Sequence, residues 1–390
     1  MKRLEEVSWN GSFFRNHVSE DPSFKRDVGS TDESAQITLS NAYSVNREIG
    51  LEKARAIIHT YRELRERMPE NSPGEFYNCY PPFEKGFGKQ DGMWQYMNGG
   101  VSSIVAGELA RGAFHYGEEA YGVDILRRMK RLADRHEGHL HVCFNGNPET
   151  TPPERTLVPL DLADSANLTP EHREGKGWGD PGNDLAELPR GKQTFAGISM
   201  NVADRGIGIS PNPAHGTPEA AVSVGRTCAS MYFLHTAGGT AARMDVIYED
   251  GQTETVLLQP GRQLGSWFMP KSGEMAAACH APKLPKGWPP YRLAWHGPNA
   301  TFDNVGVFIW GWDNPRPDAA IDRLEFSTIE RGEYFLAALT ASDRPVWFPQ
   351  SDLSFGIPDG WGAAAVVYAI IEGLAGVVDR GIAFSRVEVS

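Results

Sequence analysis

The most constraining feature of this sequence is a helix predicted over residues 101–114, because it is largely apolar and carries few bulky side chains on any face. Apolar residues recur there at helical spacing, and small residues occupy several of the positions between them: Ala106, Gly107, Ala110 and Gly112. A helix of this composition is normally buried between other helices. The chain must therefore supply neighbouring helices that pack closely against it.

A loop of unusual composition leads into this helix. Residues 90–100 combine glycines with an acid, two aromatic rings and three carboxamides, namely Asp91, Trp94, Tyr96, Gln90, Gln95 and Asn98. Aromatic faces can stack on a sugar ring, amides can pair with hydroxyl groups, and a carboxyl group can act on a glycosidic bond. We expect Trp94, Gln95, Tyr96 and Asn98 to be exposed in a cleft and to bind a substrate.

The segments around this helix predict further helices. Residues 51–68 carry one apolar stripe and charged residues elsewhere, and residues 118–136 have the same amphipathic pattern. Residues 31–47 predict another helix with Thr31 as its N-cap, and residues 7–18 predict a strand, a turn at Asn10-Gly11 and a second strand. Buried and amphipathic helices thus alternate twice, which indicates helical hairpins in two layers.

The pattern changes in the second half of the chain. Residues 145–192 are rich in Pro, Gly and Asp, and short β-prone runs such as SMYFLH and VFIWGW follow, which favours an antiparallel sandwich. The expected fold class is α+β and multidomain, with the sandwich inserted between helical segments. The predicted parts are helical hairpins over 1–150, a linker over 151–194, the sandwich over 195–345, and a final helix and strand over 346–390.

Composition and charge exclude several classes of partner. A net charge of −12 argues against nucleic acid and anionic membranes, and no apolar run is long enough to span a bilayer. The start, MKRLEEVSWNG, lacks the apolar core of a signal peptide. Four scattered cysteines show no metal-ligand spacing, so we expect no metal and no cofactor. These features leave the location open and slightly favour the cytoplasm.

Two motifs resemble one enzyme superfamily. The run Gln90-Asp91-Gly92, Trp94 and Asn98-Gly99-Gly100, and the later run from Gly360-Trp361-Gly362 to Gly376, are similar to segments of six-hairpin glycosidases such as trehalases and glucoamylases. The resemblance implies a partial (α/α)6 toroid, a cleft at the N-termini of its inner helices, and hydrolysis of a glycosidic bond with inversion. It also implies that Asp91 is a catalytic residue.

Three carboxylate-bearing segments precede predicted buried helices. We expect Asp91 to form an acid–base pair with Glu33 or Asp32, with the two roles left open, and Asp359 and Trp361 to contact the substrate. Each residue also has a structural interpretation. Asp32 and Glu33 suit the first turn of any helix, Asp91 suits a turn, and Asp359 lies in a Pro-Asp-Gly turn.

The sequence leaves several functions open. The first is a glycoside hydrolase that acts on an oligosaccharide or polysaccharide. Because far fewer helices are predicted than a complete toroid needs, the alternative is a non-catalytic carbohydrate-binding or structural fragment of a larger enzyme, whose missing remainder would be a partner. A third alternative is a scaffold that binds protein.

Overall fold

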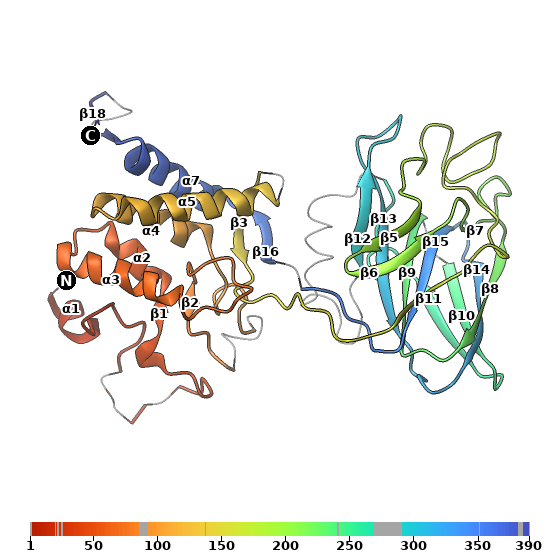
Figure 1. The fold of residues 1–390 in the computed structure, drawn as a ribbon, viewed down its shortest axis with the longest axis horizontal. Coiled ribbons are helices and arrows are strands. Elements are labelled where there is room, and N and C mark those ends of the chain that lie inside the picture. The colour runs from red at the N-terminus through yellow and green to blue at the C-terminus, as the bar shows by residue number, and fades with distance from the viewer. Residues whose placement is uncertain are drawn as a thin grey trace. The chain divides into compact units, whose positions relative to one another are not determined.

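The computed structural model describes residues 2–19, 21, 23–24, 26–85, 92–136, 138–239, 242–268, 291–350, 352–380 and 385–389. The chain forms two compact units (Figure 1). The first, called the helical unit here, comprises Met1–Glu149 and Gln350–Ser390, and the second, called the sandwich unit, comprises Thr150–Pro349. Two segments far apart in the sequence therefore build the helical unit.

The helical unit contains short helices and short strand pairs. Its helices are α1 Lys2–Ser8, α2 Leu39–Val45, α3 Leu51–Leu64, α4 Ser103–His115, α5 Glu119–Asp134 and α7 Gly360–Tyr368, with a 3₁₀ turn η1 Glu33–Ala35 and a π-helical turn η3 Ala369–Leu374. Its strands are β1 Ile37–Thr38, β2 Cys79–Tyr80, β3 His141–Phe144, β16 Leu353–Pro358, β17 Val377–Asp379 and β18 Val387–Val389. β1 pairs with β2, β16 with β3, and β17 with β18, each pair antiparallel.

Helix α4 is the centre of the helical unit, and its small residues allow the close packing. A Cβ atom added to Gly107 would lie 2.4 Å from the backbone of Ala365 in α7, and one added to Gly112 would lie 2.3 Å from a methyl carbon of Val45 in α2. Helix backbones approach this closely only where side chains are absent. The buried helix predicted over 101–114 is confirmed.

The resemblance to a six-hairpin toroid is wrong. Among the described residues, strands account for 34% of the structure and the helices are six short ones, so the fold is not a helical toroid or part of one. The expected helix over 31–47 is broken into η1, β1 and the seven-residue α2. Residues 7–18 contain the end of α1 and a single bridge between Trp9 and Phe14 in place of two strands.

The sandwich unit packs two antiparallel sheets face to face. The six-stranded sheet has the order β12-β13-β9-β15-β4 with β7 also on β15, and the four-stranded sheet has the order β11-β10-β14-β8. The strands are β4 Leu157–Leu160, β5 Gly191–Phe195, β6 Ile198–Val202, β7 Ile207–Ile209, β8 Glu219–Arg226, β9 Ser230–Gly238, β10 Ala242–Tyr248, β11 Thr253–Leu258, β12 Arg292–Gly297, β13 Val305–Asp313, β14 Ile321–Thr328 and β15 Glu333–Ser342.

The six-stranded sheet is buried on both faces. Phe233 of β9 packs into the core between the two sheets, whereas its neighbour Leu234 packs into a second core on the outer face. The hairpin β5–β6 and residues 168–190 cover that outer face, with Trp178 fully buried. Residues 151–194 are therefore part of the sandwich unit and do not form a separate linker, since β4 pairs with β15.

Candidate functional site

The N-termini of α2, α4 and α7 lie at the same end of the helical unit. The backbone N–H of Leu39, which begins α2, donates to the carbonyl of Asn78 at 2.9 Å, and the N–H of Asn78 donates to the carbonyl of Gly100 at 2.8 Å, just before α4. The first turn of α7 packs on that of α4, because a Cβ on Gly362 would lie 2.0 Å from the hydroxyl of Ser103. The loops that precede these helices are thereby brought together.

Two of these loops are joined by hydrogen bonds. The hydroxyl of Thr31 donates to the carbonyl of Pro82 at 3.1 Å and accepts from the N–H of Glu84 at 2.9 Å, and the N–H of Ser30 donates to the Glu84 carboxylate at 2.6 Å. The loop that carries Asp32 and Glu33 therefore lies beside the segment that leads into residues 86–91. Asp91 and Gln90 themselves lie outside the described residues.

Both of the other predicted catalytic carboxylates have partners. Asp32 is the N-cap of η1: its carboxylate accepts from the N–H of Ser34 at 2.9 Å and from the Ser34 hydroxyl at 2.6 Å, and these bonds lower the pKa of Asp32. Glu33 forms an ion pair with Arg26. Asp32 is thus held as a carboxylate that fits a base or a cap and does not fit a proton donor.

Aromatic side chains cluster on the loop of residues 92–100, which leads into α4, and on the segment before it. The ring of Trp94 lies 5.9 Å from that of Tyr77 and 6.2 Å from that of Tyr80, measured between centroids. The ring of Tyr96 stacks on Phe355 of β16 at 5.2 Å. Trp94 and Tyr96 are half-buried, so each presents part of an aromatic face to solvent.

The backbone of this loop is strained at both aromatic positions. Trp94 has a φ of +69° and Tyr96 a φ of +36°, in the left-handed region that residues with a Cβ rarely adopt. Such conformations cost energy and persist where the surrounding structure enforces them, which is frequent at functional sites. The Ser354 hydroxyl accepts from the N–H of Tyr96 at 2.5 Å, and the N–H of Gly146 donates to the carbonyl of Trp94 at 2.9 Å.

The two predicted amides differ in their surroundings. Gln95 is half-buried and its backbone bridges to Asn98 and Gly99. Asn98 is fully buried: its carbonyl oxygen accepts from the N–H of Phe83 at 2.6 Å, and its amide nitrogen donates to the carbonyl of Phe83 at 2.9 Å. The expectation that Asn98 is exposed in a cleft is therefore wrong. Asn98 holds the loop together from inside.

Asp359 and Trp361 lie at the start of α7. The carboxylate of Asp359 caps the helix by accepting from the N–H of Trp361 at 3.0 Å and of Gly362 at 2.9 Å. The side chain of Trp361 is 70% exposed, which is high for the largest side chain in proteins. Its indole is available as a flat binding face at the same end of the unit as the Trp94 loop.

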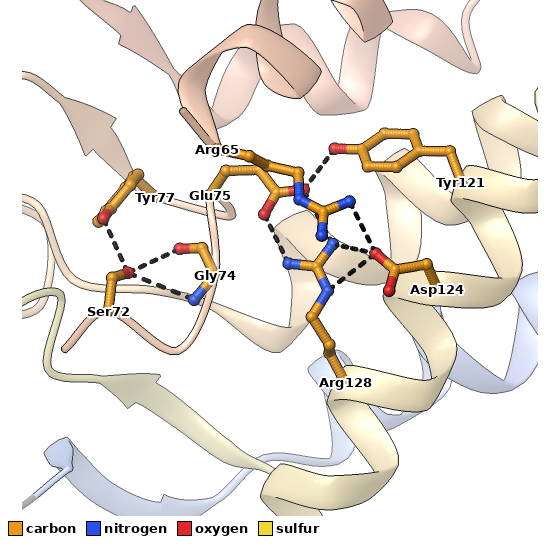
Figure 2. Close-up of polar contacts among 8 residues, drawn as sticks. All are labelled: Arg65, Ser72, Gly74, Glu75, Tyr77, Tyr121, Asp124 and Arg128. Carbon is orange, nitrogen blue, oxygen red and sulfur yellow. Dashed lines mark hydrogen bonds and ion pairs between the residues drawn. The ribbon is translucent and has the colours of Figure 1, made fainter. Parts of the chain in front are cut away.

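Sequence reasoning missed a buried polar network behind these loops (Figure 2). Arg128 of α5 binds the carboxylate of Glu75 through two nitrogens at 2.6 and 3.0 Å, and Tyr121 donates its hydroxyl to the same carboxylate at 2.6 Å. Glu75 is fully buried, and burial together with its negative charge raises the pKa of Tyr121 well above the usual value. Asp124 accepts from Arg65 and Arg128, both at 2.9 Å.

This network holds the segment that carries Tyr77 and Tyr80. Glu75 lies two residues before Tyr77, whose hydroxyl donates to the Ser72 hydroxyl at 2.7 Å. Only the Asp124–Arg128 spacing of four residues on a predicted helix signals any part of it in the sequence. The Glu75 carboxylate accepts hydrogen bonds from three donors in a fully buried position, which makes it a structural group.

Two surface hollows lie beside this network. One of about 480 Å³ is lined by Pro73, Leu132, Asp134 and three arginines of α5, and one of about 390 Å³ is lined by His59, Arg62, Glu63, Arg65 and Glu66 of α3. Acidic and basic groups are mixed in both. Neither hollow includes Trp94, Tyr96 or Trp361.

Among the described residues of the sandwich unit, His235 is the buried histidine, and it is structural. His235 accepts at Nδ1 from the Tyr334 hydroxyl at 3.1 Å and donates from Nε2 to the carbonyl of Gln263 at 3.1 Å, and its ring stacks on Trp310. Burial lowers the pKa of His235 to about 3. Over the described ranges, no group of three His, Cys, Asp or Glu side chains could hold a metal ion.

Comparison with known protein families finds no match to this chain, and comparison with curated proteins finds none either. Within the part of the chain that the structure describes, no helix combines the length and apolar character needed to cross a bilayer. The function therefore has to be inferred from the arrangement of the site.

Proposed function

We propose that this protein binds an oligosaccharide or polysaccharide at the helix N-terminal end of the helical unit and hydrolyses a glycosidic bond there. One observation supports this most directly. Hydrogen bonds join the loop of Asp32 and Glu33 to the segment leading to Asp91, at the same end as the aromatic faces of Trp94 and Trp361. Glycoside hydrolysis requires two carboxyl groups across the scissile bond, and flat aromatic side chains suit the faces of sugar rings.

The proposed chemistry assigns the two carboxyl groups complementary tasks. One donates a proton to the glycosidic oxygen as the bond from that oxygen to the anomeric carbon breaks. The other takes a proton from a water molecule, whose oxygen forms the new bond to that carbon. We assign Glu33 as the base and Asp91 as the acid. Inversion was implied only by the toroid resemblance and is not part of the proposal.

Saccharide binding without catalysis is the second candidate. It is supported by the partners of the described carboxylates, since Asp32 caps η1 and Glu33 pairs with Arg26. Under this alternative the aromatic residues Tyr80, Trp94, Tyr96 and Trp361 and the amide of Gln95 bind the sugar, and both acidic residues stabilise their loops.

Release of reducing sugar from a panel of polysaccharides, measured with wild type, Asp91→Asn and Glu33→Gln, separates the two candidates. General acids and bases contribute about 10²–10⁴-fold each, so either variant should lose at least a hundredfold in kcat with its fold intact. Asp134→Asn, which changes an exposed carboxylate of α5 paired with Lys130 and away from these loops, is the control and should retain activity. Saccharide binding with no turnover by wild type would favour the second candidate. Full activity of both variants would remove the pair from the mechanism.

Trp361→Ala tests the binding surface shared by both candidates. Because the side chain is 70% exposed, its removal should leave the melting temperature unchanged while weakening oligosaccharide binding by about tenfold, measured by calorimetry. Leu257→Ala, at an exposed position of β11 in the sandwich unit, is the matched control. Unchanged affinity in Trp361→Ala would show that the sugar does not contact α7.

A further inference from the structure

The last helix of the chain exposes an apolar face that soluble proteins normally cover. Apart from Glu372, helix α7 and the turn η3 are built from apolar and small residues, and one side packs on α4. The other side exposes four large apolar side chains: Val367 at 49%, Tyr368 at 54%, Ile370 at 41% and Leu374 at 55%. Helices that are apolar all round are buried in folded proteins.

This face continues into the strand pair that follows η3. Strand β18 adds Val387 and Val389, which are 45% and 73% exposed, on the hairpin that it forms with β17. Together these side chains present an apolar area on the order of 500 Å², near the upper end of what monomeric proteins leave exposed. Figure 1 shows α7 at the edge of the helical unit, with β18 beyond its C-terminal end.

The charged groups beside this face do not oppose its burial. Glu372, on the same turn, is paired with Arg111 of α4 at 2.6 Å, and Arg380 is paired with Glu388 at 2.8 Å. A partner that covers the face would therefore leave both ion pairs in place. The face offers apolar contact and no charge pattern that would select an acidic or basic partner.

We propose that the exposed face of α7, η3 and β18 is a homodimer interface, occupied by the same face of a second copy of this chain. A two-fold axis places identical patches against each other, so an apolar patch that is complementary to itself is sufficient to form the interface. Two copies would bury on the order of 1,000 Å² in total, which reaches the size of a specific but weak interface. Antiparallel α7 helices across the axis also align their dipoles favourably.

The dimer test uses residues outside the proposed sugar site, because Tyr368 and Leu374 lie about two helical turns or more beyond Trp361. Sedimentation velocity on the full chain from about 1 to about 100 μM should show a concentration-dependent dimer. Tyr368→Lys and Leu374→Lys place like charges across the axis and should each weaken dimerisation at least tenfold without lowering the melting temperature of the monomer. Leu257→Lys, at an equally exposed apolar position in the sandwich unit, should leave the dimer intact.

A wild-type chain that stays monomeric at the highest concentration would overturn the proposal, and so would a dimer that tolerates both lysine variants. A monomer that instead sediments with phosphatidylcholine vesicles would also overturn it, since the occupant would then be a lipid surface. Saccharide binding by a monomeric variant would show that the loss of the dimer leaves the sugar site unaffected.

Discussion

At the scale of single residues, the acids of the helical unit fall into two kinds. Asp32 and Asp359 cap helices at the surface, whereas Glu75 is fully buried and holds Arg128 and Tyr121. No local pattern distinguishes Glu75 from the exposed acids near it in the sequence. Its importance comes from Arg128, which lies far along the chain and reaches it only in the folded protein (Figure 2).

Replacing Glu75 by Gln should destabilise the helical unit strongly. The variant keeps the shape of the side chain but removes the negative charge that faces the Arg128 guanidinium, whose side chain is only 11% exposed. Breaking one partner of a buried ion pair typically costs about 3–5 kcal/mol, and we expect about 3 here because Asp124 also contacts Arg128. Urea denaturation monitored by circular dichroism measures the loss.

The control for this prediction lies on α5, the helix that carries Arg128. Lys130 and Asp134 form an exposed pair at 2.6 Å, so Asp134→Asn should change stability by less than about 0.5 kcal/mol. Equal effects of Glu75→Gln and Asp134→Asn would show that the buried network contributes no more than a surface pair. The double variant Glu75→Gln with Arg128→Met should recover part of the loss, because it removes the uncompensated charge.

At the scale of elements, the central strands of the sandwich unit show how burial on both faces is encoded. Strand β9 is buried at eight consecutive positions, and β13 and β15 are buried in the same way. Continuous apolar runs in SMYFLH and VFIWGW predict strands between two layers, and the structure confirms this. His235 is tolerated within such a strand because both of its ring nitrogens are hydrogen-bonded.

This buried histidine should make the stability depend on pH. Burial lowers the pKa of His235 from 6.5 to about 3, so the folded protein keeps a neutral ring while the unfolded chain takes up a proton below about pH 6.5. Its contribution to stability is complete above pH 6.5 and is lost as the pH falls towards 3, by up to about 1.4 kcal/mol per pH unit.

Denaturation of wild type and His235→Gln at several pH values between 7.5 and 4 checks this. The difference in unfolding free energy between the two proteins should shrink as the pH falls, because only wild type loses the contribution. A difference that stays constant across this range would contradict the assignment. Leu257→Ala, which removes no titratable group, is the control, and its effect on stability should be the same at every pH.

At the scale of the whole molecule, the sequence indicates both kinds of structure but not their connection into one fold. The apolar helix at 101–114 and the amphipathic helices at 51–68 and 118–136 are confirmed as α4, α3 and α5. The resemblance to a toroid rests on one loop that leads into a helix and on one later helical run. It is wrong because the intervening residues form short strands and loops in place of further helices.

The sequence alone determined features that depend on near neighbours along the chain. Helix period, strand alternation, the cap at Asp359 and the apolar character of α7 all arise from contacts within a few residues. The candidate site was only partly accessible in this way. The aromatic residues of the 92–100 loop stood out by composition, but the burial of Asn98 did not.

Only the tertiary structure decided the features that depend on distant residues. These are the junction of Thr31 with Pro82 and Glu84, the ion pair of Glu75 with Arg128, and the assignment of residues 151–194 to the sandwich unit. Each depends on which polar groups form hydrogen bonds or ion pairs and which apolar surfaces are buried when the chain folds. A buried carboxylate and an exposed one have the same local sequence, and they differ only in the residues that folding brings around them.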